Sequence, residues 1–216
     1  SKDYHYDSFA LVKRQTMFMA AGFIAILALQ FVDYRLLKHF AVPLYLSGIA
    51  SILLLETPLG VSANGATRWV KLPGLGQFQV SEWVKICVII FLAYLIDRNR
   101  NRLNSPKLAL YLWIAGGIPT VMLFRISNDL SSSAVVLGIC FIMSFISTKT
   151  EKLHIAVFLA AALVVVLYVW SIWSNMPTAE ELSEMSFRVG RIAAWLDPER
   201  YAASQGHQTL QGLYAI

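Results

Sequence analysis

The stretch IAVFLAAALVVVLYVW, Ile155–Trp170, contains no charged or amide side chain. A helix on the surface of a soluble protein keeps a polar face opposite its apolar stripe. This segment is apolar all round, and AAGFIAILALQFV, Ala20–Val32, has the same character. A soluble all-α core is the alternative interpretation. The two segments argue against it and favour helices that cross a membrane.

The composition agrees with this interpretation. Hydrophobic residues make up 57% of the 216, charged residues 14%, and the mean hydropathy is +0.58, whereas a soluble domain carries about 25% charged residues. The apolar stretches are Thr16–Val32, Phe40–Leu55, Trp83–Ile96, Leu108–Phe124, Ser133–Ser147 and Leu153–Trp173. We therefore predict an all-α polytopic bundle of six transmembrane helices in residues 1–173, followed by a large external loop in residues 174–216, with one membrane domain overall.

Lysine and arginine predict the orientation. The loops after the first, third and fifth stretches are short and hold eight of these residues. The cations are Arg35, Lys38, Arg98, Arg100, Arg102, Lys107, Lys149 and Lys152. The opposite side has nine over a much longer length. Because cytoplasmic loops are enriched in cations, we expect the N-terminus and residues 174–216 to be extracytoplasmic.

Several other classes of protein are disfavoured. The N-terminal residues have neither the apolar core nor the cleavage site of a signal peptide, so an external N-terminus predicts that an earlier helix precedes them. Cys87 and Cys140 lie in apolar stretches and suggest no disulfide framework. The net charge of +5 is explained by membrane lipids at the loop ends without nucleic acid.

The polar stretch ANGATRWVKLPGLGQFQVSEWVK, Ala63–Lys85, lies between two apolar stretches. Apolar and polar residues alternate over part of this stretch, and Gly65, Gly74 and Gly76 allow tight turns. Both features are compatible with a short hairpin or a re-entrant segment. A solvated interfacial loop is the alternative. Trp69 suits the headgroup level, and the guanidinium of Arg68 matches a phosphate.

The third helix begins near Ser81, a good N-cap residue, with Glu82 in the first turn. Lys85 follows at i+3, where it can pair with Glu82. Capping with an interfacial ion pair is one interpretation. A buried pair facing a cavity is the other, because ionisable groups at membrane depth are usually functional.

RISNDLSSS, Arg125–Ser133, is a second polar segment on the same side. Asn128 or Asp129 can cap the fifth helix, and the serines can satisfy its free amides. Capping alone would explain Asp129. Arg125 and Asp129 would nevertheless approach Glu82, so we predict one outward-facing substrate cavity. Its candidate residues are Arg68, Trp69, Glu82, Lys85, Arg125 and Asp129.

In the tail, FRVGRIAAWL, Phe187–Leu196, reads as an amphipathic helix lying on the membrane plane. Phe187, Ile192 and Trp195 would be its apolar anchors, with Arg188 and Arg191 on its polar side. Asp197-Pro198 should end it, and the sequence from Gln208 should begin another element.

Three segments resemble motifs of the SEDS family of bacterial shape, elongation, division and sporulation proteins. NGATRWVKLPGLGQFQVSEWVKI, residues 64–86, is similar to N-G-A-x-R-W…F-Q-P-S-E-x-x-K. NDLSSS, residues 128–133, resembles P-D-L-G-T, and residues 191–216 resemble R-I-x-x-F-L-D-P…G-Y-Q-x-x-Q-S-L-Y-A-I. The order is right along nearly the whole chain, and LYAI favours the division and sporulation branch. Val80 replaces a proline, and Asn128, Ser131 and Ser132 replace Pro, Gly and Thr.

The resemblance implies a parent of about ten helices, of which this chain would be helices two to seven. It also implies a peptidoglycan glycosyltransferase that polymerises lipid II with a class B penicillin-binding protein as partner. The same resemblance places Arg68, Trp69, Glu82, Lys85 and Asp129 in the family's cavity motifs. It puts the catalytic aspartate beyond Ile216.

Glycan transfer requires a base for the acceptor hydroxyl and neutralisation of a pyrophosphate leaving group. Arg68, Arg125 or a divalent cation (Mg²⁺ or Mn²⁺) would supply the neutralisation. Two other functions remain open from the sequence: a lipid II flippase, and a non-enzymatic scaffold that recruits a penicillin-binding protein.

Overall fold

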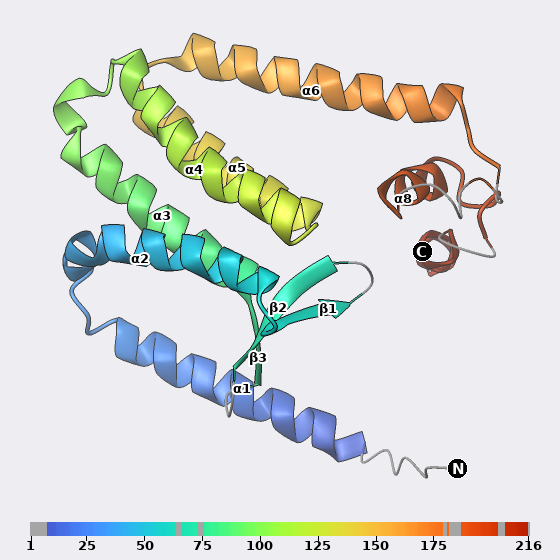
Figure 1. Ribbon diagram of the computed structural model, residues 1–216, viewed down its shortest axis with the longest axis horizontal. Helices are drawn as coiled ribbons and strands as arrows, with labels where there is room; N and C mark the ends of the chain where they lie inside the picture. Colours follow the sequence, from blue (N-terminus) through green and yellow to red (C-terminus); the bar gives the residue numbers. More distant parts are fainter. Residues whose placement is uncertain are drawn as a thin grey trace. The chain divides into compact units, whose positions relative to one another are not determined.

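Each of the six apolar stretches corresponds to one long helix, although the first two stretches extend two or three residues past the helix ends at Leu29 and Leu53. The computed structural model describes residues 8–63, 66–72, 76–178, 181, 187–202 and 206–215. The long helices are α1 (Ser8–Leu29), α2 (Leu36–Leu53), α3 (Val80–Arg98), α4 (Pro106–Ile126), α5 (Leu130–Ser147) and α6 (Glu151–Ser174) (Figure 1). The predicted turn residues Gly65 and Gly74 lie outside the described residues.

Four segments are long and apolar enough to cross a membrane: α2 extended to Glu56, and the whole of α4, α5 and α6. In α1 the apolar part is shorter, Gln15–Leu29. In α3 both ends are charged, with Glu82 and Lys85 near its start and Asp97 and Arg98 at its end. The chain is a polytopic, mainly helical membrane protein, and the count of six spans stays a prediction.

By its internal packing the chain divides into two compact units, Ser1–Thr150 and Glu151–Ile216. The predicted boundary after residue 173 concerns the membrane surface, which packing does not define. That boundary therefore stays a prediction.

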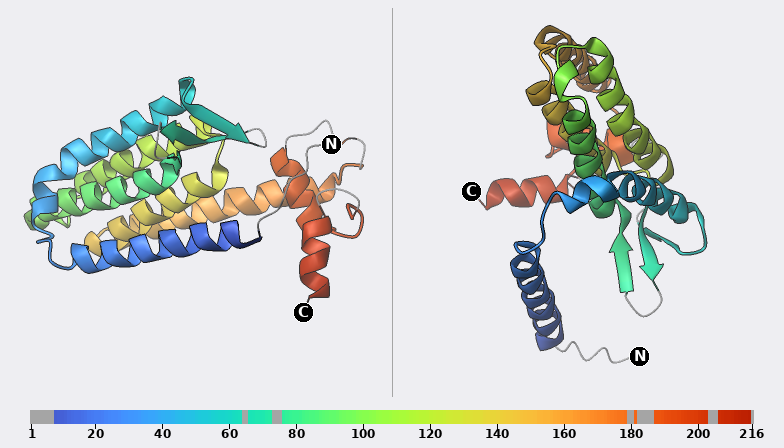
Figure 2. Two further views of the ribbon diagram at one scale, coloured as in Figure 1. Left: turned by 90° about the horizontal axis from the view of Figure 1, so that it is seen from below. Right: turned by 90° about the vertical axis from the view of Figure 1, so that its left-hand side faces the viewer.

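The core of the first unit forms around α3, which packs against α2, α4 and α5. Figure 2 shows these helices running side by side as a bundle. Val84, Val88 and Leu92 of α3 are each 1% exposed. They join Leu112 and Leu123 of α4 in one buried apolar cluster. Elsewhere the helix surfaces expose large apolar side chains, as expected where the surroundings are acyl chains.

Two glycine–cysteine contacts let neighbouring helices approach closely. Gly48 of α2 faces Cys87 of α3, and a Cβ on Gly48 would lie 3.1 Å from the Cβ of Cys87. Between α4 and α5, a Cβ on Gly116 would lie 2.5 Å from both the Cβ and the Sγ of Cys140. Small residues of this kind are typical of helix interfaces in membranes.

The polar stretch after α2 forms a three-stranded antiparallel sheet, so the hairpin interpretation is confirmed and extended by one strand. A 3₁₀ turn, η1 (Leu54–Glu56), leads to β1 (Gly60–Ala63), β2 (Ala66–Leu72) and β3 (Gly76–Gln79), in the order β1-β2-β3. In the register, Val61 and Gln79 flank Trp69 on either side. The fold is thus helical with one small sheet.

The strand β2 determines which polar side chain faces the bundle. Successive side chains of a strand point to opposite faces. Ala66 and Val70 are 4% and 2% exposed and pack against the bundle. Arg68 lies between them at a shift in the pairing with β1, where Val61 pairs with Trp69 and Ser62 with Thr67. Trp69 lies on the other face and is half-buried.

In the second unit, α8 (Phe187–Leu196) ends before Asp197, as predicted. The expected further element is α9 (His207–Tyr214). A small core joins Ile172 of α6 to Ala193 and Ala194 of α8 and to Tyr201, whose hydroxyl donates to the carbonyl of Pro177 at 2.6 Å.

The residues predicted as membrane anchors of α8 lie in different surroundings, and their contact with a membrane stays a prediction. Ile192 packs on the core of the second unit, but Trp195 is 67% exposed and lies one turn after the exposed Arg191. The buried Ala193 and Ala194 show that small side chains form the packed face. The side chains of Phe187 and Arg188 lie outside the described part.

Candidate functional site

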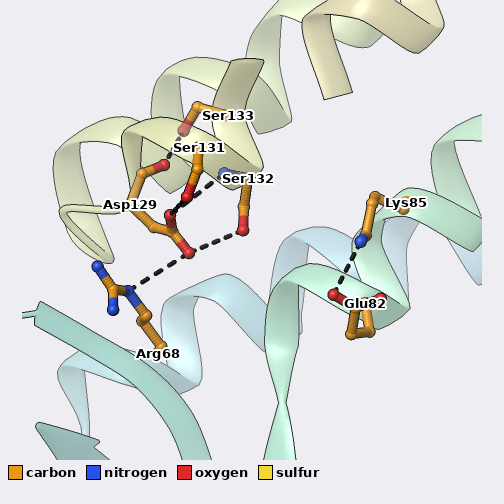
Figure 3. Close-up of polar contacts among 7 residues, drawn as sticks. All are labelled: Arg68, Glu82, Lys85, Asp129, Ser131, Ser132 and Ser133. Carbon is orange, nitrogen blue, oxygen red and sulfur yellow. Dashed lines mark hydrogen bonds and ion pairs between the residues drawn. The ribbon is translucent and has the colours of Figure 1, made fainter. Parts of the chain in front are cut away.

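Asp129 is the N-cap of α5. Its Oδ1 accepts from the backbone N–H of Ser132 at 3.2 Å and from the hydroxyl of Ser131 at 2.8 Å, while its Oδ2 accepts from the hydroxyl of Ser132 at 2.7 Å (Figure 3). Asn128 precedes it with a positive φ of 52°, a conformation that Asn tolerates better than most residues. Of the two predicted caps, Asp129 is therefore confirmed.

The serines act differently from the prediction. Ser131 and Ser132 donate their hydroxyls to the Asp129 carboxylate, and Ser133 donates its hydroxyl to the Asp129 carbonyl at 2.7 Å. They therefore hold the capping residue in place, whereas we expected them to satisfy the free amides of the helix. A carboxylate followed by hydroxyls at i+2 and i+3 is a sequence signal that identifies such a network.

Arg68 reaches Asp129 from β2. Its Nε lies 3.5 Å from Oδ2 of Asp129, and the two side chains are 32% and 4% exposed. This separation gives an ion pair and not a short hydrogen bond. The structure thus brings together two residues that lie about sixty positions apart in the sequence, from the sheet and from a helix N-terminus.

The surroundings of Asp129 keep its carboxylate ionised. Burial raises the pKa of Asp129, but the hydroxyls of Ser132 and Ser131, the backbone N–H of Ser132 and the charge of Arg68 together lower that pKa below its ordinary value. A general base works best when its pKa is near the working pH. Asp129 is therefore suited to holding a cation in place and poorly suited to accepting a proton.

Glu82 and Lys85 form a second pair on the first turns of α3. Lys85 Nζ donates to Glu82 Oε1 at 2.8 Å, with Glu82 56% and Lys85 25% exposed. The predicted i, i+3 pairing is confirmed. The more exposed partner is the carboxylate, which agrees better with an interfacial pair than with a buried one.

The predicted N-cap of α3 was wrong. The helix begins at Val80, the residue before Ser81, and its N-cap position is Gln79, which makes no side-chain capping bond. Ser81 is 3% exposed, and its Oγ has no hydrogen-bond partner among the described residues. Its place one residue inside the helix turns its hydroxyl into the packed bundle.

The candidate residues form two separate pairs. Figure 3 shows Arg68 of β2 with Asp129 and the three serines, and Glu82 with Lys85 apart from them on α3. Within the described residues no hydrogen bond or ion pair links one pair to the other. Arg125 is exposed at the end of α4, and no carboxylate of the described residues lies within ion-pair distance of it. The single cavity that would unite these residues stays a prediction.

The carboxylates of the two ion pairs already have partners. Serine hydroxyls, a backbone N–H and Arg68 occupy the oxygens of Asp129, and Lys85 occupies Glu82. Across the described residues, no group of three or more His, Cys, Asp or Glu side chains is placed to hold an ion. The described residues therefore offer no preformed metal site, and the divalent cation stays a prediction.

Comparison with known proteins identifies relatives along the whole chain. Residues 1–216 match the family model of the FtsW, RodA and SpoVE proteins, described as cell cycle protein. A probable peptidoglycan glycosyltransferase FtsW of Geobacter sp. (strain M18) is 30% identical over 219 residues, covering 100% of this chain and 55% of that protein. Stage V sporulation protein E of Bacillus subtilis (strain 168) is 26% identical over 218 residues, covering 99% and 55%.

Solved structures give the same result. A structure described as the structural coordination of polymerization and crosslinking by a peptidoglycan synthase complex matches with a TM-score of 0.66 and 26% identity, covering 94% of this chain and 56% of that chain. The rod shape determining protein RodA of Thermus thermophilus matches with a TM-score of 0.57 and 25% identity, covering 72% and 50%. The chain spans about half the length of the curated relatives it matches. It belongs to the FtsW/RodA/SpoVE family, and among its relatives are both FtsW proteins and a sporulation protein.

Proposed function

We propose that the protein containing this chain is a peptidoglycan glycosyltransferase, which polymerises lipid II into glycan strands on the outer face of the bacterial cytoplasmic membrane. Membership of the family and the names of the FtsW relatives support the activity. The observation in this chain that carries the proposal is the Arg68–Asp129 pair, in which a nearly buried carboxylate holds a guanidinium at the sheet end of the bundle.

In this proposal Arg68 binds the pyrophosphate of lipid II. Asp129 orients the guanidinium through its Nε, and the two terminal nitrogens point away from Asp129 (Figure 3). Guanidinium groups bind phosphate oxygens in bidentate fashion. An arginine held by a buried carboxylate loses little conformational entropy on binding, and its charge would stabilise the departing pyrophosphate.

The remaining candidate residues have secondary roles. Trp69, on the opposite face of β2, would lie at the headgroup level. Glu82, Lys85 and Arg125 would shape the entrance for a charged headgroup. We assign the base that deprotonates the acceptor hydroxyl to no residue of this chain, because the lowered pKa of Asp129 makes it a poor base.

The proposal also includes the sidedness and the partner. The sheet, the N-terminus and residues 174–216 would be extracytoplasmic, as the distribution of lysine and arginine predicts. A class B penicillin-binding protein would be the partner, and the related synthase complex that couples polymerization and crosslinking supports this choice. The process served would be cell division, cell shape or sporulation.

The test is polymerisation of fluorescent lipid II by the purified full-length protein with its partner, without a membrane gradient. We expect Arg68→Gln to lower the rate at least tenfold, because one lost phosphate contact in a transition state costs more than about 1.4 kcal/mol. Lys71→Gln is the matched control, since Lys71 is an exposed cation on the other face of the same strand and should leave the rate unchanged.

Two results would contradict the proposal. Translocation of lipid II without polymerisation would identify a flippase. Normal polymerisation by the partner in the presence of Arg68→Gln and Asp129→Ala variants would identify a scaffold. A divalent cation is a separate proposal: chelation should abolish polymerisation and added Mg²⁺ or Mn²⁺ should restore it.

A further inference from the structure

A cavity of about 490 Å³ lies at the opposite end of α3 from Glu82, where α2 begins and α3 ends. It is lined by Lys38, Tyr94, Asp97, Arg98 and Arg100. Three cations and one carboxylate leave the cavity with two positive charges in excess. The proposed polymerase activity uses none of these residues.

The carboxylate of the cavity, Asp97, already forms an ion pair, whereas its two arginines have no carboxylate partner among the described residues. Lys38 Nζ lies 2.6 Å from Asp97 Oδ2, with the two side chains 56% and 52% exposed. In the described part of the chain, no carboxylate lies within ion-pair distance of Arg98 or Arg100. The excess charge of the cavity is therefore carried by two guanidinium groups.

Tyr94 positions Arg98 at the cavity. Nη1 of Arg98 donates to the Tyr94 hydroxyl at 2.9 Å, and its Cζ lies 6.0 Å from the centre of the Tyr94 ring. Tyr94 is stacked with Phe91, and Phe91 with Tyr45 of α2, at centroid distances of 6.3 Å and 4.1 Å. Because this aromatic row packs between two helices, the Arg98 guanidinium starts from a fixed support and keeps donors free for an anion.

Exposed apolar side chains lie close to Lys38 along α2. Leu37 precedes Lys38 and Val42 follows it by one helical turn on the same face, and these two side chains are 40% and 45% exposed. Both lie at the start of a segment that is apolar enough to cross a membrane. A ligand at this place meets cations at its head and hydrocarbon along its tail, which is the chemistry of an anionic lipid. Basic pockets between membrane helices bind such headgroups.

We propose that this cavity is a binding site for the headgroup of one anionic phospholipid, with Arg98 and Arg100 as the phosphate ligands. The acyl chains lie against the apolar surface of α2 beside Leu37 and Val42. Asp97 limits the affinity, because it occupies Lys38 and repels the phosphate.

The test uses the full-length protein, purified in detergent and delipidated, with bound lipid counted by native mass spectrometry. The probes are phosphatidylglycerol and phosphatidylcholine with identical acyl chains. We expect one phosphatidylglycerol to bind more tightly than phosphatidylcholine. Arg98→Gln and Arg100→Gln should each weaken it about fivefold (about 1 kcal/mol per cation), and the double variant about 25-fold.

Arg102→Gln is the matched control, since Arg102 shares the short 3₁₀ helix η2 (Arg100–Arg102) with Arg100 but does not line the cavity. It should leave the affinity unchanged. Asp97→Asn should strengthen phosphatidylglycerol binding about fivefold, because it releases Lys38. Since this variant is expected to gain affinity, whereas the arginine variants lose it, the test stays decisive if the arginine variants misfold. Thermal unfolding of each variant checks its folding.

Three results would overturn the proposal. The first is equal binding of the two lipids. The second is an equal loss of affinity in Arg100→Gln and Arg102→Gln, which would indicate a diffuse surface charge. The third is displacement of phosphatidylglycerol by inorganic phosphate or an acidic peptide at millimolar concentration, which would identify a site for a soluble anion.

Discussion

The coupling between Arg68 and Asp129 can be measured with a double-mutant cycle of Arg68→Gln and Asp129→Asn. Asparagine caps helix N-termini as well as aspartate does, so Asp129→Asn keeps the cap of α5 and removes the charge. Its amide can still accept from the backbone N–H of Ser132. The cycle therefore isolates the charge–charge interaction from the loss of the cap.

The expected coupling follows from the geometry. Two unit charges at 3.5 Å attract by about 5 kcal/mol at an effective dielectric constant of about 20. Desolvation of the nearly buried Asp129 opposes this attraction, and the 32% exposure of Arg68 screens it further. We expect a coupling free energy of about 1 to 2 kcal/mol, and a larger loss of about 3 kcal/mol for Asp129→Ala, which also removes the cap.

The assay is unfolding of the full-length protein in mixed micelles, with the free energy of unfolding measured for the parent, both single variants and the double variant. Lys71→Gln in place of Arg68→Gln is the control cycle and should show no coupling, because Lys71 lies on the other face of β2. A coupling below about 0.5 kcal/mol, which is within ordinary additivity error, would refute the interpretation that this pair is an energetic link between sheet and helix.

Other perturbations test the packing and the titration. Gly116→Ala should lower the free energy of unfolding by about 1 to 3 kcal/mol because its Cβ would overlap Cys140, whereas Gly117→Ala, with nothing within 4 Å, should cost nothing; equal effects would contradict the close approach. Ser81→Ala should leave stability unchanged or raise it, because it removes a buried hydroxyl without a partner; a loss above about 1 kcal/mol would reveal an unseen bond. The pKa of Asp129 is lowered in the fold, so its contribution to stability is complete above about pH 4 and is lost as the pH falls further. Asp129→Asn should therefore flatten the acid side of a curve of unfolding free energy against pH. Parallel curves for the parent and the variant would contradict this.

The sequence predicted the helices well because their signal is local. An apolar run such as Ile155–Trp170 has few alternatives to a helix, since backbone groups in a membrane must bond within their own segment. The cap at Asp129 and the end of α8 at Asp197 depend equally on neighbouring residues. These features did not require knowledge of the tertiary structure.

The site was less predictable because it depends on the contacts of the sheet. The third strand was not predicted, and Arg68 meets Asp129 from a point in β2 where the pairing with β1 shifts. The cap at Ser81 failed for a similar reason, since packing moved the start of α3 back to Val80. Residue type identified the charged groups, but the pairing of Arg68 with Asp129 required the three-dimensional structure.

The two glycine–cysteine contacts have a practical consequence. Cys87 and Cys140 are 1% and 0% exposed and are the two cysteines of the chain, each covered by the backbone of a neighbouring helix. Membrane-impermeant maleimides should not reach either thiol in the folded protein. Residues 1–216 therefore contribute no accessible thiol, and single cysteines introduced on the sheet or in the loop between α3 and α4 would report directly which of them faces the cell exterior.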